Sequence, residues 1–101
     1  MTQNNHHQKY ENIMKLGERI FSKLSSNRRK SLIFQLLNYL KVGNYQRVNN
    51  EILRVLNVVE ADDSDKNRFI EEWSKFFYGL NDKENEMAAY SLIMGLLRIN
   101  N

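Results

Sequence analysis

The chain has 101 residues, contains neither Cys nor Pro, and carries 15 Lys and Arg against 12 Asp and Glu, a net charge of +3. This length predicts one domain, and the lack of Cys excludes disulfides, thiolate nucleophiles and sulfur metal ligands. No apolar run approaches the about 20 residues of a membrane helix, and residues 1–10 lack a signal-peptide core. We therefore expect a cytoplasmic protein with no membrane partner.

The charge is unevenly distributed along the chain. Residues 1–58 hold ten Lys and Arg and three Glu, a net charge of +7. Residues 59–101 hold five Lys and Arg and nine Asp and Glu, a net charge of −4. This asymmetry predicts two unlike surfaces, one suited to phosphates and the other to water or a basic partner protein.

In chain order, residues 1–9 are polar without a period, and we expect a flexible tail followed by a single helical-bundle domain over residues 10–101. Three helices are predicted first, over about 10–24, 28–41 and 45–58, each with apolar residues at helical spacing. Their expected buried faces are Tyr10, Ile13, Met14, Gly17, Ile20, Phe21 and Leu24; Leu32, Ile33, Leu36, Leu37 and Leu40, widened by Phe34 and Tyr39; and Tyr45, Val48, Ile52, Val55 and Leu56.

Two further helices are predicted over about 66–78 and 83–99, after an acidic, turn-forming connection at residues 60–65 that offers several helix caps. Their expected buried faces are Phe69, Ile70, Trp73, Phe76, Phe77 and Leu80, and then Met87, Tyr90, Ile93, Met94 and Leu97. No strand-like alternation is apparent. The short connections predict an all-α fold, a compact bundle of about five antiparallel helices.

Catalytic chemistry has little support in this sequence. The only histidines, His6 and His7, are adjacent in the polar tail, and two neighbouring imidazoles do not complete a metal site. The four glycines stand singly, so no phosphate-cradling loop is present. We expect no catalytic residue, metal, cofactor or small-molecule substrate, and hence a protein that is not an enzyme.

Basic residues form three groups in the first half of the chain. Lys15, Arg19 and Lys23 are spaced i, i+4, i+8, which places them as a ridge opposite the apolar face of the first helix. An ordinary solvated helix face would explain this ridge as well as a binding surface does.

A second group, Arg28, Arg29 and Lys30, crowds the predicted start of the second helix. Cations there cost about 0.3–1 kcal/mol each against the helix dipole, so their presence favours a bound anion. The alternative is that they extend into water at small cost. The third group, Arg47 and Arg54, lies away from the apolar face of the third helix. We predict that all three groups contact nucleic-acid phosphates rather than bases.

The turn Val42-Gly43-Asn44 also suggests a helix-turn-helix, which is a minority interpretation. Tyr39 stands four positions before the glycine, where a small residue is usual, and its bulk would obstruct the packing of the two helices.

Two segments resemble a known family. The sequences LLNYLKVGNYQRVNNEILRVL (36–56) and FFYGLNDKENEMAAYSLIMGLL (76–97) are similar to the helical C-terminal region of the large subunit of type I CRISPR Cascade complexes, which some systems also make as a separate small subunit. The resemblance covers about residues 28–98 and consists of degenerate patterns. The chain has no counterpart to the preceding part of the large subunit, which leaves no part for reading a protospacer-adjacent motif.

The resemblance implies a subunit that stacks, often in several copies, beside the large and backbone subunits of the ribonucleoprotein complex and supports the guide–target duplex or the displaced DNA strand. For the residues that contact nucleic acid, the resemblance implies only basic character, and only at Arg28, Arg29, Lys30, Arg47 and Arg54. Two alternatives remain: a helical adaptor without nucleic-acid contact, and a small phage or plasmid DNA-binding regulator.

Overall fold

The computed structural model describes residues 2–76 and 82–99, with side chains from Gln8 onward. This part of the chain is 83% helical, contains five helices and no strand, and confirms the predicted all-α bundle. The helices are α1 (Thr2–Phe21), α2 (Ser26–Lys41), α3 (Tyr45–Val58), α4 (Asp63–Ser74) and α5 (Asp82–Leu97). The third helix has the predicted bounds, whereas α1 and α4 begin earlier than expected.

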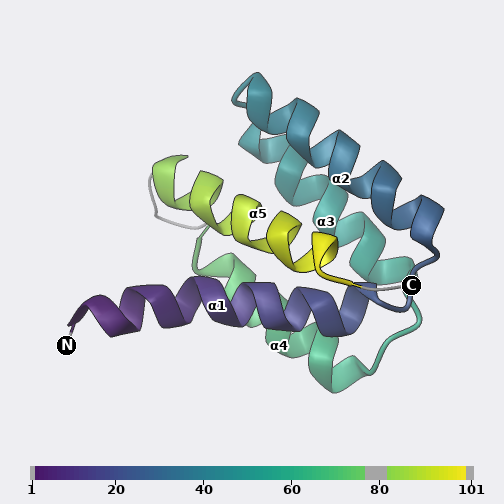
Figure 1. The fold of residues 1–101 in the computed structure, drawn as a ribbon, viewed down its shortest axis with the longest axis horizontal. Helices are drawn as coiled ribbons and strands as arrows, with labels where there is room; N and C mark the ends of the chain where they lie inside the picture. The colour runs from purple at the N-terminus through teal and green to yellow at the C-terminus, as the bar shows by residue number, and fades with distance from the viewer. Residues whose placement is uncertain (1, 77–81, 100–101) are drawn as a thin grey trace.

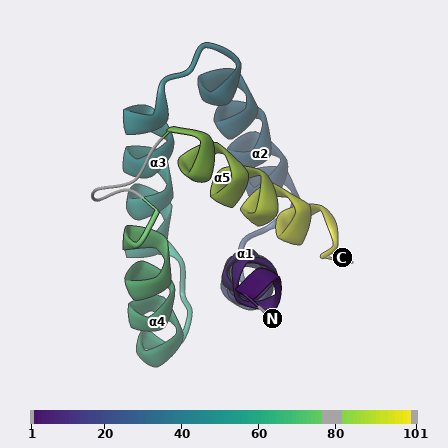
Figure 2. The ribbon, with the colours of Figure 1, turned by 90° about the vertical axis from the view of Figure 1, so that its left-hand side faces the viewer.

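Consecutive helices alternate in direction, so α1, α3 and α5 run roughly one way and α2 and α4 the other (Figure 1). α5 packs against α1, α2 and α3, and α1 also packs against α4. In the view along α1, helix α4 continues the line of α3 on one side of the molecule (Figure 2). Helices α2 and α5 lie on the other side. α5 therefore joins α1 to the hairpin of α2 and α3.

Local sequence explains the hairpin of α2 and α3. The Ser25 hydroxyl accepts a hydrogen bond from the Arg28 backbone N–H at 3.2 Å and caps α2. Gly43 has φ +71°, the left-handed region open to glycine, and Asn44 caps α3 by accepting from the Arg47 N–H at 3.2 Å. The two helices pack against each other and run in opposite directions (Figure 1), unlike the steeply crossed pair of a helix-turn-helix.

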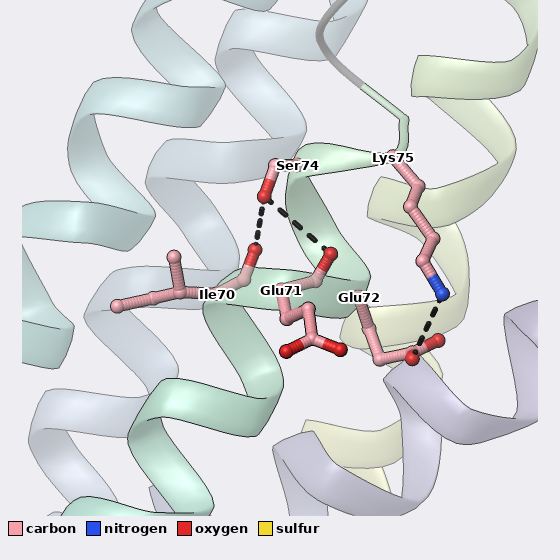
Figure 3. Close-up of polar contacts among 5 residues, drawn as sticks. All are labelled: Ile70, Glu71, Glu72, Ser74 and Lys75. Atoms are coloured by element: carbon pink, nitrogen blue, oxygen red, sulfur yellow. Dashed lines mark hydrogen bonds and ion pairs between the residues drawn. The ribbon is translucent and has the colours of Figure 1, made fainter.

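The end of α4 is marked by two side chains (Figure 3). The Ser74 hydroxyl donates to the Ile70 carbonyl and, at 3.4 Å, to the Glu71 carbonyl. Lys75 Nζ lies 3.1 Å from Glu72 Oε2, where a cation also complements the negative end of the helix. At the other end, Asp62 occupies the N-cap position without a side-chain cap hydrogen bond.

The core between α1 and α4 is built on aromatic rings. Phe69 stacks on Trp73 with ring centroids 5.8 Å apart, and Phe21 meets Phe69 edge-on at 5.9 Å. Tyr10 stacks on Phe76 at 5.2 Å. Such pairs add about 0.5–1.5 kcal/mol to their area burial. Phe69, Trp73 and Phe76 are buried as predicted.

The predicted buried face of α5 is wrong for every member except Ile93. Met87, Tyr90, Met94 and Leu97 are 44–63% exposed, and the helix instead buries Asn85, Ala88, Ala89, Leu92 and Leu96. The reason is close packing with α1. A Cβ built on Gly95 would lie 2.5 Å from the Met14 carbonyl oxygen, so only a face of small residues lets these helices approach.

Four smaller expectations also differ. Phe34, Leu37 and Ile70 were expected inside but are 71%, 40% and 41% exposed. α1 includes residues 2–9, expected as a tail, because a polar run without Pro or Gly can continue a helix without an apolar face. The expectations for Phe77 and Leu80 lie outside the described residues.

Candidate nucleic-acid interface

A groove of about 470 Å³ runs between α2 and α3. Each helix supplies residues spaced i, i+3, i+4, i+7, one face of a helix. The lining residues are Leu24, Arg28, Ser31, Leu32 and Gln35 on one side and Glu51, Arg54, Val55 and Val58 on the other. Apolar side chains form part of the lining, and Arg28 and Arg54 contribute cations from facing helices.

An adjoining hollow of about 280 Å³ extends this groove toward the start of α2. It shares Leu24, Arg28 and Val58 with the groove, so the two are continuous. Its other lining residues are Lys23, Ser25, Val59 and Glu60. Lys23, Arg28 and Arg54, one from each predicted basic group, therefore border a single surface depression, which we call the α2–α3 groove.

Within the α2–α3 groove, Arg54 is held in place by Glu51. Arg54 Nε and Nη2 donate to the two carboxylate oxygens of Glu51 at 3.3 and 2.6 Å. These hydrogen bonds, and secondly the charge of Glu51, raise the pKa of Arg54. A guanidinium has five N–H donors, and this pair leaves the others able to reach a phosphate. Glu51 thus orients Arg54 but lowers the positive charge of the groove.

Arg47 extends the cationic face along α3. It stands seven residues before Arg54, about 10 Å away along the helix. Its guanidinium carbon lies 5.8 Å from the centroid of the Tyr39 ring on α2, a cation–π geometry. Its position continues the line of Glu51 and Arg54 on the same face of α3.

Arg29 was predicted as a phosphate contact, and the structure places it in the interior instead. It is 4% exposed, and its Nη1 donates to the Leu24 carbonyl oxygen at 2.6 Å. That carbonyl lies just beyond α1, among the groups left without an intrahelical partner where a helix ends. The sequence expectation fails because Arg29 lies about 100° around α2 from Arg28, which turns it toward the core.

The remaining predicted cations do not border the α2–α3 groove. Lys30 is exposed and lies about 160° around α2 from Arg28. Lys15 pairs with Glu11 at 2.9 Å, and Arg19 Nε lies 3.2 Å from Asp65 Oδ2 on α4. Lys15 and Arg19 border a separate hollow of about 210 Å³ beside α4. The expected ridge is therefore divided, and only Lys23 lies at the groove.

The predicted anion site at the start of α2 has fewer free backbone donors than expected. The N–H groups of Arg28 and Arg29 are bonded to the hydroxyl and carbonyl oxygens of Ser25 at 3.2 and 3.0 Å. A bound anion would meet the side chains of the groove rather than a cluster of open backbone donors.

Sequence reasoning did not find Glu51, Gln35 or Tyr39 as parts of this surface. The spacing of Glu51 and Arg54, three residues apart on one helix, was the available signal for their pairing. Gln35 and Tyr39 carry no such signal, because their place beside α3 depends on how the helices pack.

Across the described residues, no three His, Cys, Asp or Glu side chains come together as metal ligands. The side chains of His6 and His7 lie outside the description. None of the described helices combines the length and apolar character needed to cross a lipid bilayer.

No protein-family model, curated protein or solved structure shows a significant similarity to this chain.

Proposed function

We propose that this chain is a non-catalytic, cytoplasmic protein that holds a nucleic-acid backbone in the α2–α3 groove without sequence preference. The observation that carries this proposal is the convergence of Lys23, Arg28 and Arg54 on one continuous depression. Guanidinium groups bind phosphate oxygens through paired hydrogen bonds, and such contacts fix position without reading sequence.

The composition of the α2–α3 groove supports backbone contact over base recognition. Its lining contains no aromatic ring on which a base could stack, and the apolar lining is aliphatic. Arg47, on the same face of α3, would extend the contact by another phosphate. Glu51 and Glu60 also border the depression, so affinity should be moderate and strongly salt-dependent.

We further propose that the chain acts as the small subunit of a type I CRISPR surveillance complex. The support is the sequence resemblance of residues 28–98, the range that contains most of α2, all of α3 and the groove residues Arg28 and Arg54. In this role it would bind the large and backbone subunits and further copies of itself, and hold the guide–target duplex or the displaced strand as part of antiviral defence.

The first test measures binding of the full chain to fluorescent random-sequence DNA and RNA by anisotropy across a salt series. The double variant Arg28→Gln with Arg54→Gln should weaken binding on the order of tenfold at low salt and reduce the salt slope by about 1 to 2. The matched control, Lys30→Gln with Lys83→Gln, removes the same charge outside the groove and should change affinity by about twofold or less. Equal losses in the two variants would contradict the groove.

The second test concerns the assembly. The chain is co-expressed with the large and backbone subunits of a type I complex, and the purified complex is tested for target DNA binding. The groove variant should enter the complex normally and weaken DNA binding. If the chain does not join the complex, or if the variant complex binds DNA as tightly as the wild type, the CRISPR assignment fails.

A further inference from the structure

The outer face of α5 is apolar and uncovered. Met87, Tyr90, Met94 and Leu97 are 45%, 44%, 55% and 63% exposed. Their spacing, i, i+3, i+7 and i+10, places them on one face, opposite the buried alanines and leucines of the same helix. From Met87 onward α5 is apolar on nearly all sides, and such a helix is normally buried on all sides, so this face has the character of an interior surface.

α2 extends this apolar surface. Phe34 and Leu37 are 71% and 40% exposed. α2 packs against α5, and the two helices lie together to the right of α3 and α4 in Figure 2. We call the six side chains together the α2–α5 face. A patch of this kind on a small domain typically marks an interaction site.

Lysines end the α2 stripe of the α2–α5 face. Lys30, Phe34, Leu37 and Lys41 are spaced i, i+4, i+7 and i+11, a single stripe of α2, which contains no acidic residue. On α5, Lys83 stands one turn before Met87, between Asp82 and Glu84 in sequence. Arg98, directly after Leu97, pairs with Glu18 of α1 at 3.5 Å. Glu86, at the edge toward α3, accepts a hydrogen bond from the Tyr45 hydroxyl at 3.0 Å.

We propose that the α2–α5 face binds an acidic amphipathic helix of another protein. The apolar stripe of such a helix would cover the exposed Met, Leu and aromatic side chains. Its acidic flanks would meet Lys30 and Lys41 at the ends of the α2 stripe and Lys83 at the start of the α5 stripe. α5 has 16 residues, about 24 Å of helix, enough to support four turns of a partner. The two methionines can adjust to the partner's side chains.

Two other occupants fit the face less well. A two-fold contact in which α2 faces α2 would place Lys30 and Lys41 of the two copies against each other, and α2 has no acidic residue to offset the repulsion. Insertion into a bilayer needs apolar side chains that project past their neighbours, whereas those of α5 are already about half covered by the bundle. A helix laid across the face covers them without rearrangement.

The test uses the full chain and a synthetic fluorescent peptide about four turns long, with Leu at helical spacing flanked by Glu. Its matched control is a scrambled peptide of the same composition. By anisotropy, the amphipathic peptide should bind at least tenfold more tightly than the scrambled one. Met94→Glu and, independently, Met87→Glu should each weaken binding at least tenfold.

Ile70→Glu is the matched protein control, because it makes the same change at an exposed apolar position of α4. It should leave peptide binding unchanged, with circular dichroism confirming that all variants are folded. Equal binding of both peptides, or equal losses in the Met94 and Ile70 variants, would overturn the proposal.

Two further readouts separate the other occupants. Binding to phosphatidylserine vesicles that Met94→Glu abolishes would overturn the proposal in favour of a membrane surface. Sedimentation that shows self-association abolished by Met94→Glu would overturn it in favour of a second copy. This inference does not rest on the nucleic-acid proposal, so Arg28→Gln with Arg54→Gln should leave peptide binding unchanged.

Discussion

Three consecutive cations on α2 have three different environments. Arg28 borders the α2–α3 groove, Arg29 is buried against the Leu24 carbonyl, and Lys30 is exposed on the opposite side of the helix. A rotation of about 100° per residue separates them. The sequence shows that the three cations are adjacent, but which of them faces the core is decided by the packing of α2 on its neighbours.

The buried environment of Arg29 predicts a stability effect. Arg29→Ala removes the donor to the Leu24 carbonyl at the end of α1, and a buried acceptor left without a partner costs about 1–3 kcal/mol. Urea unfolding should show this loss in the free energy of unfolding. Arg28→Ala, on the exposed neighbour, should stay within about 0.5 kcal/mol of the wild type. Equal effects would contradict the interior placement of Arg29.

The hydrogen bond between Tyr45 and Glu86 predicts a dependence on pH. It favours the protonated phenol and, with burial and the nearby charge of Glu86 as smaller causes, raises the pKa of Tyr45 above its ordinary value of 10.0. The stabilisation is therefore fully present below about pH 10 and is lost as the pH rises through the higher folded-state pKa.

Tyr45→Phe removes both the bond and this titration. From pH 8 to pH 11, the wild type should lose more of its thermal midpoint than the variant does. A wild type and variant whose midpoints fall in parallel across this range would show that the hydroxyl does not contribute.

At the level of the helices, periodicity predicted their number and their class, and the bounds of α3. It failed on the orientation of α5, because a helix with apolar residues on all sides satisfies more than one choice of buried face. The large side chains Met87 and Met94 suggested the core, yet the small residues of α5 are the ones that let α1 approach. Which face of α5 is buried depends on how closely α1 packs against it, and periodicity within one helix does not predict this.

The close approach of α1 and α5 predicts unequal effects of two similar substitutions. In Gly95→Ala, the new methyl group would lie 2.5 Å from a backbone oxygen of Met14, which the helix cannot move cheaply. In Gly17→Ala, it would meet the Cδ1 end of the Leu92 side chain, which can adjust.

We expect Gly95→Ala to destabilise the protein by about 1–3 kcal/mol, as overpacking does. In Gly17→Ala, the gain in helix propensity, up to about 1 kcal/mol, should offset most of the cost. Thermal unfolding of the two variants measures the difference. If Gly17→Ala were the more damaging substitution, the described packing of α1 on α5 would be wrong.

For the whole molecule, the charge split along the sequence becomes a partial separation in space. Lys23, Arg28 and Arg54 gather at the α2–α3 groove, the feature on which the proposed phosphate contact rests. Arg19, however, pairs with Asp65 of the acidic half at 3.2 Å and joins α1 to α4. The composition shows the excess of cations in residues 1–58. Which of these cations border the groove, which is buried in the core and which forms an ion pair between helices depends on the fold.

An NMR titration of the labelled full chain with a short random-sequence oligonucleotide tests the proposal that the α2–α3 groove holds a nucleic-acid backbone. We predict that amide and side-chain shifts concentrate at Lys23, Arg28, Gln35 and Arg54 and disappear when salt is raised. Shifts that instead concentrate at Lys15, Arg19 and Arg68, beside α4, or that are absent from the groove at saturation, would contradict this role of the α2–α3 groove.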